Sequence, residues 1–204
     1  MTKNFLVLDF ETTGLDHTIE QVTEIAAIKY DEQLNEIEAY HSYVNLHVEH
    51  GLSDFIKKLT GITEAMLATG VPEKDAMAKL AKMIDPQTIV VAQYAPFDFA
   101  YLSNHGIYPE VYFCTKTLTN LYEPKEKSGL SDTCKRNGIV LENAHTAMAD
   151  ARATKEVLQL RLSQGLKTYN NTITIQADRP LKFLPQNTKQ LIDMKALKDG
   201  SYTI

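Results

Sequence analysis

Three β-strand-like segments joined by short polar turns occupy the start of the chain, and this pattern constrains the fold more than any other feature. Residues 4–10 form a nearly continuous β-prone run, as expected of a central strand buried on both faces. Residues 22–30 and 37–46 are the second and third strand candidates. Because the connections are short, the pattern predicts an antiparallel meander.

Beyond the meander, helical periodicity alternates with short apolar runs. Helices are expected at residues 63–68, 73–84, 97–104, 130–137 and 146–164, and strands at 88–92 and 111–114. Three antiparallel strands followed by alternating helices and strands predict an α/β fold with a mixed sheet flanked by helices. Residues 168–172 are interpreted as a polar connector, and no clear period follows them.

Composition places the chain among ordinary globular proteins. Its 204 residues are 44% hydrophobic and 23% charged, which excludes the disordered, collagen-like and disulfide-scaffold classes. The net charge of −5 argues against gripping nucleic acid by bulk positive charge. Residues 1–165 hold 15 basic and 23 acidic residues, whereas residues 166–204 hold 6 and 3. We interpret residues 1–165 as the main domain and residues 166–204 as a basic extension that binds a partner or the substrate.

The cysteine content and the hydropathy pattern bear on location. Cys114 and Cys134 are too few for a disulfide framework, and the N-terminus does not resemble a secretion signal. No apolar run approaches the roughly 20 residues that a membrane span requires. We therefore expect a cytoplasmic protein with no membrane partner.

Asp9 and Glu11 stand at the end of the first expected strand. An ionised carboxylate is costly to bury unless it is paired or binds a metal, and residues two apart on a strand share a face. A cation between the two side chains would remove their repulsion. Alternatively, the strand ends at Phe10 and both residues are solvated in a turn.

Three further polar residues follow buried segments. Asp98 lies after the strand at 88–92, where α/β sheets bind ligands, although an aspartate there could also cap the next helix. His145 and Asp150 are five residues apart, so one continuous helix would separate their side chains by about 140°. We therefore expect His145 in the loop before the last helix and Asp150 on its first turns. An ordinary surface histidine is the alternative interpretation of His145.

Together these positions supply four carboxylates and a histidine from separate elements. Oxygen ligands without a cysteine or histidine cluster suit Mg²⁺ or Mn²⁺ better than Zn²⁺. Two such ions about 4 Å apart can stabilise both the attacking and the leaving oxygen in phosphodiester cleavage. A histidine can accept the proton of the attacking water near neutral pH. The pattern predicts metal-dependent phosphodiester hydrolysis.

Three motifs in order resemble those of the DnaQ-like, or DEDDh, 3′→5′ exonuclease family. They are Asp9-Phe10-Glu11-Thr12-Thr13-Gly14-Leu15, Tyr94-Ala95-Pro96-Phe97-Asp98 and His145-Thr146-Ala147-Met148-Ala149-Asp150. Residues 59–63 also resemble a family loop that precedes a helix. The resemblance covers residues 4–162 and implies a ribonuclease H-like fold. Thr146 stands where the family's other branch has a tyrosine, so the histidine branch is the one resembled.

The resemblance also implies roles for these residues. Two Mg²⁺ or Mn²⁺ ions would be held by Asp9, Glu11, Asp98 and Asp150. His145 would be the general base. The pocket for the terminal nucleotide would be lined by Thr12, Thr13, Gly14 and Leu15, with Leu15 against the base. Phe97 would either stack on the substrate or belong to the core. Tyr94 replaces the family's usual asparagine, which leaves substrate positioning near Asp98 open.

The expected activity is the release of 5′-mononucleotides from the 3′ end of a nucleic acid. DNA is favoured over RNA as the substrate, and single-stranded ends are favoured over paired ones. Lys125, Lys127, Lys135, Arg136 and the basic extension are candidate helpers in attracting the substrate. An exoribonuclease with the same chemistry is the first alternative.

A proofreading or binding module is the second alternative. Such a module would be recruited to a polymerase or a sliding clamp through residues 166–204. Residues 190–194 faintly resemble a clamp-binding peptide, and an ordinary tail helix is the competing interpretation.

Overall fold

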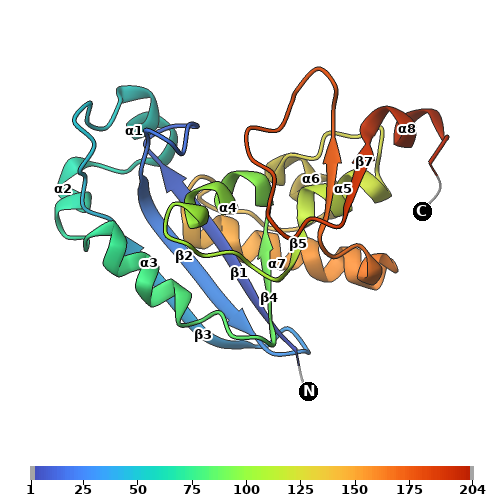
Figure 1. Cartoon of the computed structure of the whole chain (residues 1–204), viewed down its shortest axis with the longest axis horizontal. Coiled ribbons are helices and arrows are strands. Elements are labelled where there is room, and N and C mark those ends of the chain that lie inside the picture. The colour runs from blue at the N-terminus through green and yellow to red at the C-terminus, as the bar shows by residue number, and fades with distance from the viewer. Residues whose placement is uncertain (1–2, 203–204) are drawn as a thin grey trace.

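The computed structural model describes residues 3–202 and is built around a five-stranded mixed sheet (Figure 1). The strand order is β3-β2-β1-β4-β5. The strands are β1 (Asn4–Thr12), β2 (Val22–Tyr30), β3 (Glu36–Tyr43), β4 (Thr88–Ala92) and β5 (Val111–Cys114). The first three pair antiparallel, whereas β4 runs parallel to both β1 and β5. This arrangement confirms the predicted α/β architecture of three antiparallel strands followed by parallel ones.

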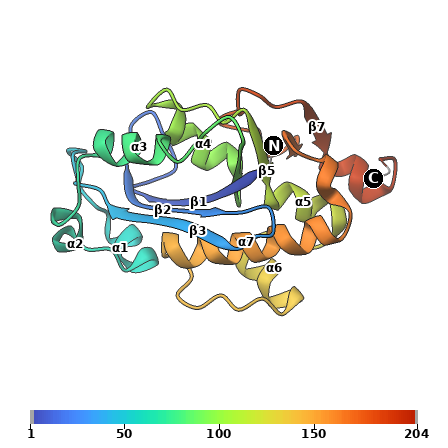
Figure 2. The same ribbon diagram turned by 90° about the horizontal axis from the view of Figure 1, so that it is seen from below.

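Helices cover both faces of the sheet. Those that follow β3 are α1 (Asp54–Thr60), α2 (Glu64–Ala68) and α3 (Glu73–Ala81). Those that follow β4 and β5 are α4 (Ala95–Ser103), α5 (Thr115–Tyr122), α6 (Leu130–Asn137) and α7 (Ala147–Ser163). Figure 2 shows α3 and α4 on one side of the sheet and α7 on the other. Within residues 3–202, none of the helices combines the length and the apolar character needed to cross a membrane.

The two faces of β1 belong to two different cores. Leu6, Leu8 and Phe10 pack with the helices α3 and α4, whereas Phe5 and Val7 pack with α5 and α7. This alternation follows from the two-residue period of a strand. It places Asp9 and Glu11 on the face that α7 covers. Because β1 continues to Thr12, the interpretation that the strand ends at Phe10 is wrong.

Most predicted elements are present, with differences at their ends. The strands β2, β4 and β5 and the helix α6 have the predicted bounds. By contrast, β3 ends at Tyr43 rather than at residue 46, and α3 ends at Ala81 rather than at residue 84. The helix α4 begins at Ala95 rather than at residue 97. Two helices, α1 and α5, were not predicted.

The segment after α7 contains regular elements that the sequence did not reveal, and residues 169–171 of the predicted polar connector link two of them. It contains the 3₁₀ helix η1 (Leu166–Thr168), the parallel strands β6 (Thr172–Ile175) and β7 (Gln190–Asp193), and α8 (Met194–Asp199). Leu166, Ile192, Met194 and Leu197 join the core beneath α5 and α7. Residues 190–193 form β7 rather than a tail helix, and Met194 begins α8. Ile192 and Met194 are buried, whereas Leu191 is exposed.

Candidate active site

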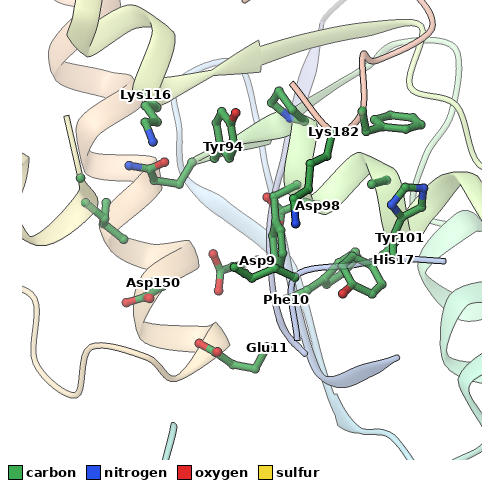
Figure 3. A pocket seen from close by; sticks show the side chains of 18 of the residues that line it. Asp9, Phe10, Glu11, His17, Tyr94, Asp98, Tyr101, Lys116, Asp150 and Lys182 are labelled. Carbon is green, nitrogen blue, oxygen red and sulfur yellow. The ribbon is translucent and has the colours of Figure 1, made fainter. Parts of the chain in front are cut away.

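One cavity of about 570 Å³ gathers the polar residues that the sequence singled out. It lies at the carboxyl ends of β1 and β4, where the parallel part of the sheet meets the start of α4. Its lining includes Asp9, Glu11, Asp98, His145 and Asp150. Figure 3 shows the labelled carboxylates arriving from β1, α4 and α7 around a common space. The fold therefore joins residues separated by more than a hundred positions in the chain.

The two carboxylates of β1 are held in an unfavourable environment. Burial raises the pKa of Asp9 well above its ordinary value, and the charges of Asp98, Asp150 and Glu11 raise it further. Burial also raises the pKa of Glu11 to about 8, with additional repulsion from Asp150, Glu24 and Asp98. Carboxylates that crowd and desolvate one another in this way form a site for a cation.

The remaining two carboxylates come from the first turns of helices. Asp98 is 3% exposed, and burial raises its pKa to about 8. It does not cap α4, because the helix begins at Ala95 and Tyr94 occupies the cap position, so the capping interpretation is wrong. Asp150 lies in the first turn of α7, and burial raises its pKa as well. Its Oδ2 accepts a hydrogen bond from the backbone N–H of His145 at 3.3 Å.

His145 lies in the loop before α7, as predicted, and its side chain is exposed. Its φ of 68° is a left-handed conformation that residues other than glycine adopt rarely, and the residue lines the cavity. A ring nitrogen of His145, a carboxylate oxygen of Glu11 and one of Asp150 lie within 4.8 Å of one another. The histidine is therefore placed among the carboxylates rather than on an unrelated surface.

The donor set fits a hard divalent cation. Asp150 Oδ1 is buried and has no hydrogen-bond partner among residues 3–202, so this oxygen is available to a cation. The neighbouring carboxylates Asp9, Glu11 and Asp98 share its cavity. Mg²⁺ and Mn²⁺ prefer such oxygen ligands, and a divalent charge would relieve the repulsion among them.

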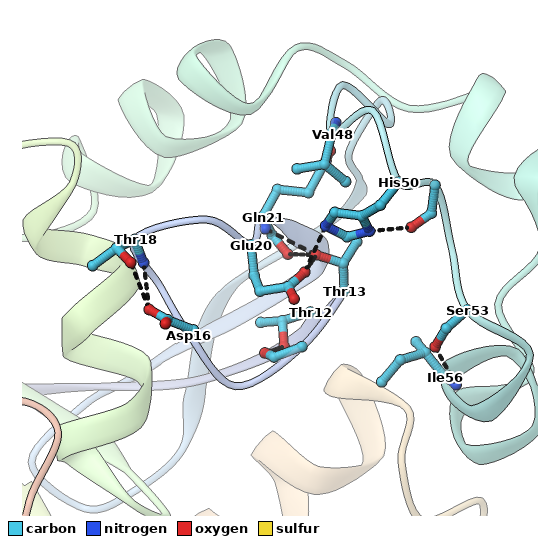
Figure 4. A network of polar contacts seen from close by, with 12 residues as sticks. Thr12, Thr13, Asp16, Thr18, Glu20, Gln21, Val48, His50, Ser53 and Ile56 are labelled. Atoms are coloured by element: carbon cyan, nitrogen blue, oxygen red, sulfur yellow. Dashed lines mark hydrogen bonds and ion pairs between the residues drawn. The ribbon is translucent and has the colours of Figure 1, made fainter.

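The loop after β1 was expected to line the terminal-nucleotide pocket, and only Leu15 of its four residues lines the cavity. Leu15 is 71% exposed. Thr12 Oγ1 donates to the carbonyl of Gly14 at 2.6 Å, and Thr13 Oγ1 donates to Glu20 Oε2 at 2.5 Å (Figure 4). The two threonines are thus buried, and their hydrogen bonds fix the shape of the loop that carries Leu15 into the cavity lining.

Gly14 allows the tight packing of this loop. A Cβ there would lie 2.5 Å from Glu20 Oε1, so any larger residue would displace the Glu20 side chain. The hydroxyl of Tyr101 on α4 donates to the carbonyl of Gly14 at 2.7 Å. The loop is therefore fixed against α4 as well as within itself.

Two aromatic residues of the second motif line the cavity. Phe97 is half-buried, contacts the core and meets the ring of Tyr101 edge-on at 5.4 Å, so it lies at once in the core and in the cavity wall. Tyr94 lies under the Nζ of Lys116, which is 4.4 Å from the ring centroid. The charged group of Lys116 therefore lies against the ring of Tyr94, the residue that replaces the family's usual asparagine.

Glu24 is a fifth carboxylate that the sequence did not reveal. It lies opposite Glu11 in the pairing of β1 with β2 and is 3% exposed. Its Oε1 is 2.6 Å from Nε2 of His41, and its Oε2 accepts from the backbone N–H of Ala147 at 3.2 Å. Glu24 therefore anchors the first residue of the helix that carries Asp150. A glutamate inside the apolar run of residues 22–30 was the available signal.

The C-terminal segment also contributes to the cavity. Arg179, Pro180, Lys182 and Phe183 line it, together with Lys116 of α5. Only the basic composition of residues 166–204 indicated a role near a substrate, and nothing in the sequence placed these side chains next to the carboxylates.

Fold and cavity together define the ribonuclease H-like nucleases as the class of protein. The family model described as Exonuclease matches residues 6–158. The chain therefore belongs to this exonuclease family, and its three motifs resemble those of the DnaQ-like, DEDDh 3′→5′ branch.

Known proteins of related sequence and structure agree with this assignment. The PolC-type DNA polymerase III of Lactococcus lactis is 32% identical over 173 residues, which cover 81% of this chain and 10% of the polymerase. Exonuclease I of E. coli in complex with a dT13 oligonucleotide matches with a TM-score of 0.66 and 24% identity, covering 81% of this chain and 41% of that one. The nuclease domain of 3′hExo bound to rAMP matches with a TM-score of 0.68 and 17% identity, covering 80% and 94%. The chain spans only 10 to 14% of the length of the polymerases it matches.

Proposed function

We propose that the protein is a Mg²⁺- or Mn²⁺-dependent exonuclease that releases 5′-mononucleotides from single-stranded DNA 3′ ends. The convergence of four carboxylates and His145 on one cavity carries this proposal. The match to the DNA polymerase of L. lactis and the oligonucleotide bound to exonuclease I favour DNA as the substrate.

Asp9, Glu11, Asp98 and Asp150 would hold two divalent ions. When bound, such ions stabilise the attacking and the leaving oxygen of a phosphodiester displacement. The carboxylates themselves are positioned by rigid elements, since β1 is a central strand and α4 and α7 pack on the sheet. Their fixed geometry reduces the reorganisation needed during the reaction.

His145 is the proposed general base. Its ring reaches the cavity from an exposed loop, so it can exchange protons with solvent after each turnover. Asp150 holds the backbone of this loop through the N–H of His145, which couples the position of the base to that of a proposed metal ligand. The base would take the proton of the attacking water, because a histidine side chain can act as a general base near neutral pH.

Activity on a 5′-labelled single strand tests the proposal, because the label stays on every product shortened from its 3′ end. With Mn²⁺ we expect stepwise loss of nucleotides that EDTA stops, and Asp9→Asn and Asp150→Asn should each lower turnover at least 1,000-fold while circular dichroism stays unchanged, by analogy with removal of other essential catalytic groups. Glu49→Gln removes an exposed carboxylate outside the cavity and serves as the matched control. Digestion without metal, or none with Mn²⁺, contradicts the proposal.

The role of His145 is tested separately from metal binding. His145→Ala should lower turnover about 100-fold or more while calorimetry records Mn²⁺ affinity close to that of the unaltered protein, because general-base catalysis contributes roughly 10²–10⁴-fold. A matching loss of Mn²⁺ affinity would instead make His145 a metal ligand, which its distance to Glu11 and Asp150 also permits.

An exoribonuclease is the second candidate. The rAMP in the 3′hExo structure is the observation that favours it. Proteins distinguish RNA from DNA through the 2′-hydroxyl, so cleavage of matched DNA and RNA strands decides between the two. If RNA is cleaved faster than DNA of equal length, RNA replaces DNA as the proposed substrate.

A proofreading role is the proposal for the biological setting. This chain matches about a tenth of the length of the PolC-type DNA polymerase III of L. lactis. We infer that it acts together with a polymerase. Co-elution with a replicative polymerase in gel filtration, together with faster removal of mismatched than of matched 3′ ends, tests this role.

A further inference from the structure

The loop between β6 and β7, residues 176–189, forms one wall of the candidate active site and is called the C-terminal loop below. Figure 1 shows it extending from the two-stranded sheet toward α4. Arg179 and Lys182 from this loop line the same cavity as the carboxylates. In Figure 3 the side chain of Lys182 extends from the loop into this cavity.

The C-terminal loop is anchored at its middle and at its end. The ring of Phe183 meets His17 edge-on at 5.7 Å. Toward β7, Asn187 Nδ2 donates to the carbonyl of Pro109 at 3.0 Å, and the hydroxyls of Thr188 and Tyr112 lie 2.8 Å apart. These contacts tie the loop to the opposite side of the cavity and to β5, so Arg179 and Lys182 are presented from a fixed wall.

A second cavity of about 640 Å³ adjoins the first. Tyr94, Lys116, Gly129 and Arg179 line both. The two cavities are therefore neighbours, with Lys116 and Arg179 at the junction between them.

The second cavity differs from the first in charge. Its five basic residues are Lys116, Lys125, Lys127, Arg179 and Lys198, against three acidic ones. Within residues 3–202, none of the ion pairs involves any of these five. Lysines and arginines left free in a cavity are available to phosphate oxygens. A cavity whose carboxylates suit metal ions thus lies next to a more basic one that suits phosphates.

We propose that the second cavity binds the backbone of the nucleotides that precede the 3′ end of a single strand, with Lys116 and Arg179 on phosphates at the junction. This inference rests on the proposed function, in which the 3′ end occupies the first cavity. Tyr94 at the junction offers an aromatic face, and single-strand sites pair a basic groove with aromatic rings on which unpaired bases stack. The C-terminal loop, which lies outside the matched family region, supplies Arg179.

Binding to strands of increasing length is the first test. In an Asp150→Asn background, which prevents turnover, affinity measured by fluorescence anisotropy should rise from dT2 to dT12. The substitutions Arg179→Ala and Lys116→Ala should each lower the affinity for dT12 at least fivefold. Each should also reduce the slope of log affinity against log salt by about 0.7, the value for one phosphate contact in a single strand. Lys167→Ala removes an exposed lysine of η1 that lines neither cavity and should change nothing.

A parallel series with the RNA strands U2 and U12 distinguishes DNA from RNA as the source of the phosphate backbone. An equal length dependence for DNA and RNA supports recognition of the backbone itself. Length-independent affinity for both series, or salt slopes that the two substitutions leave unaltered, overturns the proposal.

Turnover of two substrates separates this inference from the proposed function. The p-nitrophenyl ester of dTMP fills only the first cavity, whereas dT12 would fill both. Arg179→Ala and Lys116→Ala should lower kcat/KM at least tenfold more for dT12 than for the ester. If the unaltered protein cleaves neither substrate, the proposed function fails. If it cleaves both and the substitutions affect both equally, only the second binding site is overturned.

Discussion

Asp9 shows how a single residue can be placed for chemistry at the expense of stability. It lies among Asp98, Asp150, Glu11 and Glu24, and burial together with their charges raises its pKa well above the ordinary value. A raised carboxyl pKa means that the charged form is less favourable in the folded than in the unfolded state. The metal-free protein should therefore lose stability as the pH rises from the ordinary carboxyl range toward about 8, the pKa of Glu11 and Asp98.

Asp9→Asn should raise the melting temperature of the metal-free protein at pH 8, because it removes one charge from this cluster and keeps the side-chain shape. Mn²⁺ should raise the melting temperature of the unaltered protein and have much less effect on the variant, since binding to the folded state alone stabilises it. Differential scanning fluorimetry at pH 5 and pH 8, with and without Mn²⁺, measures both effects. A lower melting temperature for metal-free Asp9→Asn at pH 8 would show that the charge supports the fold.

At the scale of elements, the position of α7 determines the geometry of the site. The helix carries Asp150 and is preceded by His145, and its small buried residues Ala147 and Ala151 let it pack closely on the sheet. Its first N–H groups lack partners within the helix, and Glu24 accepts one of them from Ala147. A strand of the sheet thus holds the end of the helix that carries Asp150 and follows His145.

Glu24→Ala should destabilise the protein by about 1.5–3 kcal/mol, the range for a hydrogen bond to a charged group. Mn²⁺ affinity should fall about 10-fold or more, as it does when groups that support metal ligands are removed. Glu24→Gln retains an acceptor for the N–H of Ala147 and should keep most of the affinity. Calorimetric titration with Mn²⁺ compares the two variants, and equal losses in both would indicate that the charge, rather than the anchor, is what matters.

Local signals were sufficient for some elements and not for others. Buried apolar runs bounded by turns identified β2, β4 and β5. In contrast, α5 starts directly after β5 with no polar break, and three of its eight residues are threonines, whose branched side chains favour strands. The strands β6 and β7 have four residues each and pair across a long loop, so only tertiary contacts specify them.

The same division holds for the candidate site. Asp9, Glu11, Asp98, His145 and Asp150 stand in motifs, so sequence alone predicted their convergence on one cavity. Glu24 reaches the site through its register opposite Glu11, and Arg179 and Lys182 reach it through the packing of a distant loop. Residues that act through position rather than through a motif become visible only in the folded chain.

At the scale of the whole molecule, the C-terminal segment is joined to the sheet through Asn171. This residue is fully buried and adopts a φ of 53°, a conformation that asparagine tolerates better than most residues. Its N–H donates to the carbonyl of Tyr112 at 2.8 Å, and its Nδ2 donates to the carbonyls of Glu110 and Asn187 at 2.9 and 2.8 Å. One side chain thus bonds the edge of the central sheet to the end of the C-terminal loop.

Asn171→Gly should therefore loosen the segment without straining the backbone. It removes the donor to the partly buried carbonyls of Glu110 and Asn187 and the acceptor for the backbone N–H of Tyr112. A loss of about 2–4 kcal/mol is expected from these hydrogen bonds. Asn171→Ala should lose about 1–2 kcal/mol more, because alanine also resists the left-handed conformation. Thermal unfolding measures both differences.

Limited trypsin digestion of the same variants reports on the segment itself. Cleavage after Lys182 should become faster in both variants than in the unaltered protein, because the wall that holds this residue is released. Since Arg179 also lines both cavities, the variants should lose affinity for dT12 in proportion to that release. A variant that is destabilised yet keeps its cleavage rate and its dT12 affinity would show that the C-terminal loop is held by Phe183 and β7 independently of Asn171.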